Sequence, residues 1–390
     1  MPQGFLGILA LATVLLPAPA LQAAVTAPAG KARQGGSPYV SSKNCGACHD
    51  VMYKMWADSP HARSAQSPAF LETLRRVVEA APDKQAARQG CVWCHAPTTI
   101  LTGDLELQQP ISREGVTCDF CHTVADVDLE KEGTPFVLKP GPVKRGPFEY
   151  ASKIQGHEAA YSALHRASPL LCAACHEFRN ARGVPVLSNY SEWKDGPYPA
   201  RGVACQDCHM ALVPGAPARG AAPKSGLRVV NLHRLVGGSS ISQLARGLDL
   251  KIESVAIAGG TAEVAVVVTN VAAGHSIPGG LSTKSLVLAV AAEGADGRLE
   301  NRQERVYRRE LKDDRGTVVE TVADMFLKAA TVGSDTRIKP KESRRERFGV
   351  TVPAGARAIV ARLEYRDASD PRGAPSILTV TEVKRPLGVR

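Results

Sequence analysis

The sequence has no cysteine outside one repeated pattern, so none is left over for an additional disulfide or a separate reactive thiol. All ten cysteines fall in five units of the form C-x-x-C-H. After residue 24 the sequence also lacks any apolar run that could cross a bilayer, which needs about 20 residues. No transmembrane span is therefore expected once a signal peptide is removed.

In each unit two thiols lie three residues apart and a histidine follows at once. This spacing lets the thiols add to the two vinyl groups of one haem while the imidazole binds its iron. Zinc sites and disulfides are the alternatives for paired cysteines, but neither needs a histidine after every second cysteine. We therefore predict five covalently bound haem c groups. The units are Cys45/Cys48/His49, Cys91/Cys94/His95, Cys118/Cys121/His122, Cys172/Cys175/His176 and Cys205/Cys208/His209.

The formal net charge of +10 would by itself favour an acidic partner such as nucleic acid. Five haems would add ten propionates and, when oxidised, five positive iron centres, which changes the balance to about +5 oxidised and about zero reduced. Basic residues are then expected either to pair with propionates or to be solvated. The charge gives no support to nucleic-acid binding.

Residues 1–24 have an apolar centre and small residues near a cleavage point, as in a secretory signal peptide. They lack the Lys or Arg that usually precedes the apolar centre of a signal peptide. A membrane anchor is the alternative, but Pro17 and Pro19 interrupt the apolar run. Residues 25–44 are predicted to be a flexible leader. Because bacteria attach haem c outside the cytoplasm, we expect a periplasmic location or export to the outer surface.

Residues 45–212 are expected to form a pentahaem domain of short helices and loops. A helix should follow His49 and end near Ser59-Pro60, and Pro82 should split a second helical segment. Residues 131–148 are predicted to be an exposed loop, followed by a helical passage at 149–176. Gly-Val-Thr-Cys and Gly-Val-Ala-Cys precede the third and fifth units, which indicates a repeated two-haem segment with the first unit added in front.

Residues 213–245 are expected to be a linker that carries one candidate distal ligand. Residues 246–390 then contain short strands, such as LDLKIESVAIA and KSLVLAVAAE, separated by glycine-rich turns. This pattern favours an antiparallel β-sandwich domain. The predicted fold class is thus a multidomain α+β protein.

Four segments carry a resemblance to a known family: CGACHDVMYKMWADSPHA, EGVTCDFCHTV, NYSEWKDGPYPARGVACQDCHM and NVAAGHSIPGG. They resemble multihaem c-type cytochromes of the cytochrome c-554 (c-552/4) family. The resemblance covers roughly residues 45–280 and implies an electron carrier with closely packed haems. Some relatives also bind a small nitrogen or sulfur compound at an open iron. The last segment departs from the family's Pro-Thr-Gly, because Gly279 follows Pro278.

Five histidines lie outside the units, as many as the predicted irons. Complete bis-histidine ligation is therefore permitted, although a lone histidine is often a surface or hydrogen-bonded residue. The resemblance implies distal ligands at His61 and His275. The other candidates are His165, His233 and His157.

Three functions follow from these features. Bis-histidine irons are closed to substrates, so the first is an electron carrier between redox partner proteins rather than an enzyme. The second is a reductase or oxidase of a small nitrogen or sulfur compound at one open haem; the pentahaem nitrite reductases differ, because they use C-x-x-C-K in one unit. The third is a self-assembled extracellular filament, in which a neighbouring chain would supply a distal ligand.

Overall fold

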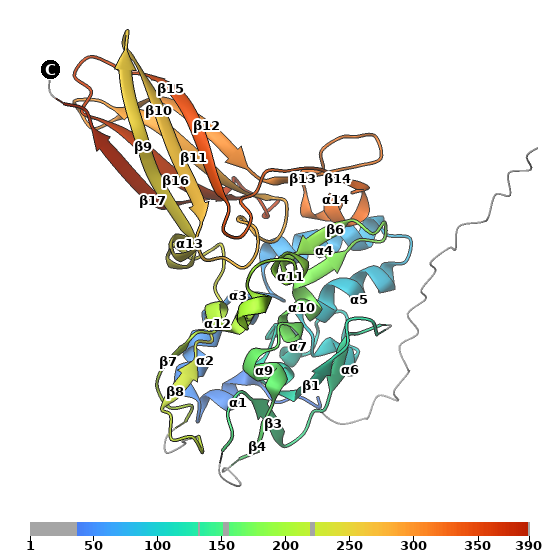
Figure 1. Cartoon of the computed structure of the whole chain (residues 1–390). Helices are drawn as coiled ribbons and strands as arrows, with labels where there is room; N and C mark the ends of the chain where they lie inside the picture. Colours follow the sequence, from blue (N-terminus) through green and yellow to red (C-terminus); the bar gives the residue numbers. More distant parts are fainter. Residues whose placement is uncertain (1–36, 132, 151–155, 219–222, 389–390) are drawn as a thin grey trace, which may run out of the picture.

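The computed structural model describes residues 37–388 except 132, 151–155 and 219–222. It has two parts, which are drawn one above the other in Figure 1. Short helices and two-stranded sheets make up the motif region, here residues 45–212. Long antiparallel strands make up the β region, residues 246–388. This is the predicted α+β arrangement, and the predicted signal peptide and most of the leader lie outside the described residues.

Short helices dominate the motif region, and its first half contains no long β-strand. Pro68 begins α4 and the α4 helix ends before Pro82, so the predicted split of this segment is confirmed. The helix predicted after His49 is also present and ends before Ser59. The helices in this half are α1 Ser42–Gly46, α2 Asp50–Ala57, α3 Pro60–Arg63, α4 Pro68–Ala80, α5 Lys84–His95, α6 Thr99–Thr102, α7 Pro110–Arg113 and α8 Cys118–Thr123.

The second half of the motif region mixes short helices with small hairpins. Its elements are β1 Val124–Val127, β2 Phe136–Leu138, β3 Val143–Gly146, β4 Glu158–Tyr161, α9 Ala163–Ala167, α10 Leu170–His176, β5 Glu177–Arg179, β6 Pro185–Ser188, α11 Asn189–Lys194, the 3-10 helix Pro199–Arg201, α12 Cys205–His209 and β7 Leu212–Pro214. Beyond it lie β8 Val229–Asn231 and α13 Ile241–Gly247.

Two local predictions are wrong in this half. The segment expected to be a loop contains β2 and β3, and Phe136 is a buried anchor in a cluster with Phe120 and Val124. The segment expected to be helical contains β4, which pairs in parallel with β3, and its described residues are helical only in α9 and α10. The β2 strand is anchored by the buried side chain of Phe136. It is too short to show the alternation of residue types that predicts a strand.

The β region is an antiparallel sandwich of two sheets, ordered β15-β10-β9 and β12-β11-β16-β17. In β9, Leu248, Leu250 and Ile252 are buried while the residues between them face water, so the alternation that predicts this strand is confirmed. The inner faces of both sheets form one hydrophobic core. The strands are β9 Leu248–Ala258, β10 Thr261–Asn270, β11 Lys284–Glu293, β12 Leu299–Tyr307, β15 Ser343–Thr351, β16 Ala358–Asp367 and β17 Ser376–Pro386.

An excursion from the sandwich covers the motif region. It consists of β13 Arg309–Lys312, α14 Val322–Leu327 and β14 Thr331–Asp335, and it lies beside β6 and α4 in Figure 1. Met325 is fully buried in a cluster with Val184 and Val186 of the motif region. Asn180 donates hydrogen bonds to the carbonyl oxygens of Met325 and Ala329. The two regions are therefore joined by packed side chains as well as by the chain.

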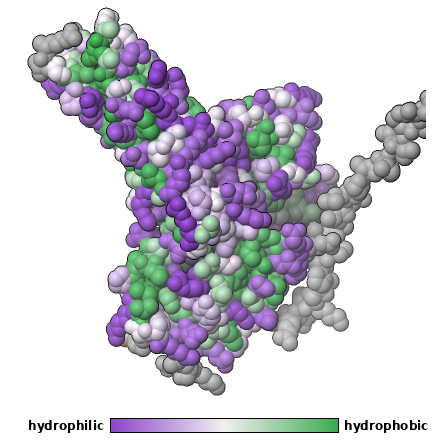
Figure 2. All heavy atoms as spheres, in the orientation of Figure 1, coloured by the Kyte–Doolittle hydropathy of each residue, from purple (hydrophilic) through white to green (hydrophobic). Residues whose placement is uncertain are grey.

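Hydrophilic residues cover much of the face drawn in Figure 2, and hydrophobic residues gather in patches over the motif region. Among the described residues, no helix has both the length and the apolar character needed to cross a membrane.

Candidate functional site

One continuous cavity of about 2670 Å³ runs through the motif region to the edge of the β region. Pockets for a single small molecule usually measure roughly 300–1,000 Å³, so this cavity can hold several large groups. All ten cysteines and all ten histidines line it. The structure thus brings together every predicted attachment and ligand residue around one space.

The five units lie in or directly at helices, in chain order α1, α5, α8, α10 and α12. Cys118 begins α8, where the Thr117 hydroxyl accepts a hydrogen bond from the Phe120 N–H. The two glycines of the internal repeat both adopt left-handed backbone conformations, Gly115 at φ 70° and Gly202 at φ 66°. A side chain at Gly115 would also collide with the His61 carbonyl. The repeated Gly-Val-x-Cys pattern is therefore a backbone requirement that turns the chain into the motif helix.

Four unit histidines face a second imidazole across the cavity. Two imidazoles that bind one metal from opposite sides through bonds of about 2 Å have ring centroids roughly 6 Å apart. The observed centroid separations are 5.9 Å for His49/His157, 6.2 Å for His176/His61, 6.4 Å for His209/His275, and 5.7 and 6.4 Å for His122 with His165 and His233. These separations fit a shared haem iron.

Backbone carbonyls orient most of these imidazoles. A carbonyl oxygen can only accept, so each Nδ1 must carry the proton and Nε2 keeps its lone pair for a metal. The Nδ1–H groups of His49, His122 and His209 donate to Pro217 (2.6 Å), Arg145 (2.5 Å) and Val236 (2.8 Å). The remaining donors of this kind are His95 to Ser64, His157 to Glu158, His233 to Asn231 and His275 to Ser276.

His165 differs from the other distal candidates. Its Nδ1 bonds to the Ser162 hydroxyl at 2.9 Å, and its Nε2 lies 2.8 Å from the carbonyl oxygen of Cys121. Both ring nitrogens are thus occupied. Cys121 directly precedes His122, so this contact also holds His165 beside the backbone of the unit. The expectation that His165 ligates iron stays a prediction, and these two hydrogen bonds oppose it.

His95 has no comparable histidine partner among the described residues. Its ring stacks instead on Phe70, with centroids 4.0 Å apart and planes inclined at 10°. Phe70 belongs to α4, and no sequence signal singles it out. Unit two therefore differs from the other four units, in which a second histidine faces the unit histidine.

Burial favours the neutral form of several cavity imidazoles by lowering their pKa. It is the largest cause that lowers the pKa of His61, His176 and His233 to about 4, and neighbouring histidines lower it further. Burial also lowers the pKa of His95, His122 and His209. A neutral imidazole is the form that binds a metal.

Thiols of different units meet in three places. Cys45 and Cys118 lie close enough to shift each other's pKa, as do Cys94 and Cys175, and Cys172 and Cys205. Donation of a hydrogen bond to the neighbouring sulfur is the largest cause that raises the pKa of the Cys118, Cys175 and Cys172 thiols. The contacts join unit one to unit three, unit two to unit four, and unit four to unit five.

Several buried polar atoms at the cavity wall have no hydrogen-bond partner among the described residues. They include Nη1 of Arg145, the Tyr198 hydroxyl and Oδ1 of Asn231. A buried guanidinium nitrogen without a partner is costly, and a haem propionate is a suitable partner for it. The ring separations, the thiol positions and these unpaired atoms together fit haem. Among the described residues, no cluster of three or more His, Cys, Asp or Glu side chains is arranged to hold a bare metal ion.

Comparison with known proteins gives two informative matches. Residues 44–123 match the family model described as "Cytochrome c554 and c-prime". The crystal structure of a penta-heme cytochrome c552 from Thermochromatium tepidum matches with a TM-score of 0.71 and 20% identity, over 90% of this chain and 100% of that chain.

Two further results add no support. Northeast Structural Genomics Consortium target SoR45 matches 35% of this chain and 82% of its own with 10% identity, but at a TM-score of 0.17 it carries no argument. No curated protein matches the sequence.

Proposed function

We propose that the chain is a multihaem c-type cytochrome of the cytochrome c-554 family, that it binds five haem c groups covalently, and that it passes electrons between redox partner proteins. Haem iron supplies one-electron redox chemistry. The protein holds each group by two cysteines, orients the imidazoles and excludes water. Four imidazole pairs at haem-compatible separations are the observation that carries the proposal.

The proposed axial pairs are His49/His157, His122/His233, His176/His61 and His209/His275. His233 is preferred to His165 as the partner of His122, because its Nδ1 donates to the Asn231 carbonyl and its Nε2 is not engaged. His165 is then a hydrogen-bonding residue that steadies the Cys121 carbonyl. Bis-histidine coordination favours a low potential and little structural change between oxidation states.

The contacts between thiols support a connected path for electrons. Units one and three meet through Cys45 and Cys118, and units four and five through Cys172 and Cys205. The Cys121 thiol of unit three is also close enough to affect Cys172 and Cys175 of unit four. The resulting order is one, three, four and five, with unit two as a branch from unit four through Cys94.

Quantitative electron paramagnetic resonance of the oxidised protein tests this function. Four bis-histidine haems should give four low-spin ferric equivalents, and a redox titration should show all of them accepting electrons reversibly. A spectrum in which most of the iron is high-spin would contradict the electron carrier.

The surroundings of His95 favour a second candidate, the reduction or oxidation of a small nitrogen or sulfur compound. With Phe70 against its ring and no histidine opposite, this unit is proposed to hold one open haem. One high-spin equivalent that binds carbon monoxide when reduced, with turnover of nitrite or hydroxylamine, would support this activity. Carbon monoxide binding without turnover would support electron transfer as the only one of these two functions.

Export, and the division into a pentahaem domain at 45–212, a linker at 213–245 and a β-sandwich domain at 246–390, are also proposals. The β7–β8 hairpin and α13 lie in or at the edge of the linker, which is thus partly structured. Filament formation remains the third candidate, which imaging at moderate concentration tests.

A further inference from the structure

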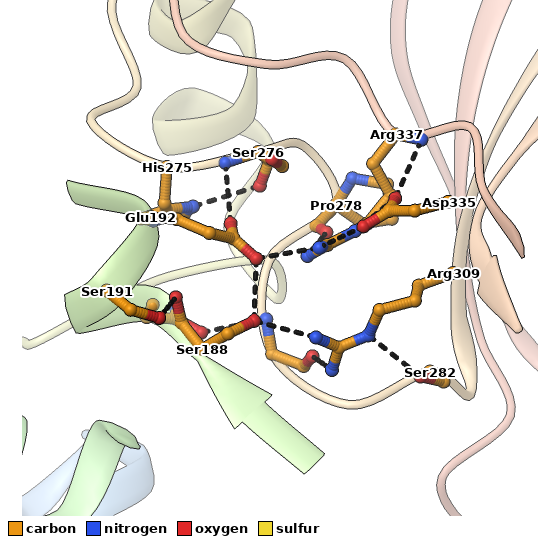
Figure 3. A network of polar contacts seen from close by, with 12 residues as sticks. Ser188, Ser191, Glu192, His275, Ser276, Pro278, Ser282, Arg309, Asp335 and Arg337 are labelled. Atoms are coloured by element: carbon orange, nitrogen blue, oxygen red, sulfur yellow. Dashed lines mark hydrogen bonds and ion pairs between the residues drawn. The ribbon is translucent and has the colours of Figure 1, made fainter. Parts of the chain in front are cut away.

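We propose that Glu192 is a positioning residue for the fifth haem: its part-buried carboxylate, paired with Arg337, holds the loop that presents His275 to the iron. The proposal rests on the proposed axial pair His209/His275. It concerns a residue between units four and five that neither binds haem through sulfur nor ligates iron. Figure 3 shows the contacts around this carboxylate.

The β region fixes only one side of the His275 loop. Asn270, at the end of β10 and fully buried, donates from Nδ2 to the carbonyl oxygens of His275 (3.0 Å) and Ile338 (3.1 Å). Ile277 and Ile338 exchange two backbone hydrogen bonds. These bonds attach the loop to the sandwich, but they do not set its position relative to His209.

Glu192 makes one of the links to the motif region, beside Asn189, whose Oδ1 accepts the N–H of Gly280 at 3.1 Å. Glu192 lies on α11, and its Oε2 accepts the N–H of Ser276, the residue after His275, at 2.9 Å. Its Oε1 accepts from the Ser188 hydroxyl and from Nη2 of Arg337, both at 2.6 Å. One carboxylate thus connects the helix before unit five, the ligand loop and the β region. The His209 and His275 rings face each other at 6.4 Å with planes inclined at 12°.

The charge of Glu192 is balanced inside the interface. The side chain of Arg337 is 5% exposed and bonds to both Glu192 and Asp335. It also donates to the carbonyl oxygen of Pro278, two residues beyond Ser276. Arg309 is buried beside this group and bonds to the Ser188 hydroxyl and the Val186 carbonyl. Because hydrogen bonds to charged groups are stronger than neutral ones, the network can hold the loop in one position.

Two substitutions separate the hydrogen bond from the charge. Glu192→Gln keeps an oxygen that can accept the Ser276 N–H, whereas Glu192→Ala removes both the acceptor and the charge. For the alanine variant we expect loss of one low-spin equivalent in the oxidised protein and binding of one additional carbon monoxide after reduction. The glutamine variant should keep most of the low-spin signal. Added imidazole should restore the low-spin signal of the alanine variant.

The matched control is Glu364→Ala. Glu364 is 6% exposed and pairs with Arg302 and Arg366, but it lies on β16 of the sandwich. This variant should lower the melting temperature without changing the spin-state count. An unchanged low-spin count in Glu192→Ala, or an equal loss of low-spin signal in Glu364→Ala, overturns the positioning role.

His275→Ala distinguishes failure of this inference from failure of the axial assignment. Loss of one low-spin equivalent in His275→Ala together with an unchanged Glu192→Ala refutes only the role of Glu192. An unchanged His275→Ala refutes the axial pair, and the positioning role falls with it.

Discussion

His122 and His233 lie face to face, with ring centroids 6.4 Å apart and planes inclined at 21°. They come from distant parts of the chain, one from a haem unit and the other from the segment that leads to the sandwich. His165 lies at a similar distance from His122, but both of its ring nitrogens are engaged. Hydrogen bonding, and not distance, therefore distinguishes the two candidates.

Replacing these two histidines separately tests the distinction. His233→Ala should convert one low-spin haem to high-spin, because the iron of unit three loses its distal imidazole. His165→Ala should leave the spin states unchanged and lower stability by about 1 kcal/mol, the value of a typical hydrogen bond. Electron paramagnetic resonance and thermal melts of both variants give the result. The reverse pattern would make His165 the ligand.

Substitution of His275 by methionine should raise the potential of one haem. A thioether ligand favours the reduced iron relative to imidazole, so a shift on the order of 100 mV is expected within the range that axial ligands control. Spectroelectrochemical titration measures it. The other haems should keep their potentials to a first approximation, and a titration curve that matches the unmodified protein would exclude His275 as a ligand.

Gly279 leaves room for the His275 ring. A Cβ atom at this position would lie 2.7 Å from Cε1 of His275, so Gly279→Ala must displace either the imidazole or the backbone. We expect a weakened axial bond, seen as a partial high-spin signal from one haem. Gly373→Ala is the control, because a Cβ there meets no atom within 4 Å. Identical spectra for both variants would contradict the account of this loop.

The ion pairs of Glu364 should make the stability of the β region depend on pH. Burial raises the pKa of this carboxyl, but hydrogen bonds from Arg302 and Arg366 outweigh it and lower the pKa below the usual 4.5. A lowered folded-state pKa gives stability that is present above pH 4.5 and is lost as the pH falls through the folded value.

Glu364→Gln should therefore cost about 2 kcal/mol at pH 7, and less at pH 4 and below. Denaturant unfolding of the variant and of the unmodified protein at several pH values measures the difference in their free energies of unfolding. Effects of pH that are common to both proteins cancel in this difference. A difference that does not change with pH would rule out the ion pairs as its source.

Much of the fold could be predicted because it depends on local patterns. The alternation of Leu248, Leu250 and Ile252 predicts a strand, and Pro82 predicts a helix boundary; both are confirmed. The family resemblance predicted for residues 45–280 is matched by the family model over residues 44–123. The β2 and β4 strands were missed because they are short and depend on tertiary contacts such as the burial of Phe136.

The candidate site was predictable in its residue types but not in its pairing. C-x-x-C-H specifies the attachment of a haem and one axial ligand. The sequence around a single histidine does not indicate which iron that histidine faces. The stacking of Phe70 on His95 and the bond from Ser276 to Glu192 join residues far apart in sequence. Only the folded chain brings these groups together.

The mass of the exported, mature protein tests the central claim most directly. Ten cysteines that all line one cavity should hold five haems through thioether bonds, which survive denaturation. Mass spectrometry of the denatured protein should therefore give the polypeptide mass plus five haem groups. A correctly exported protein that carries fewer than five would contradict the account.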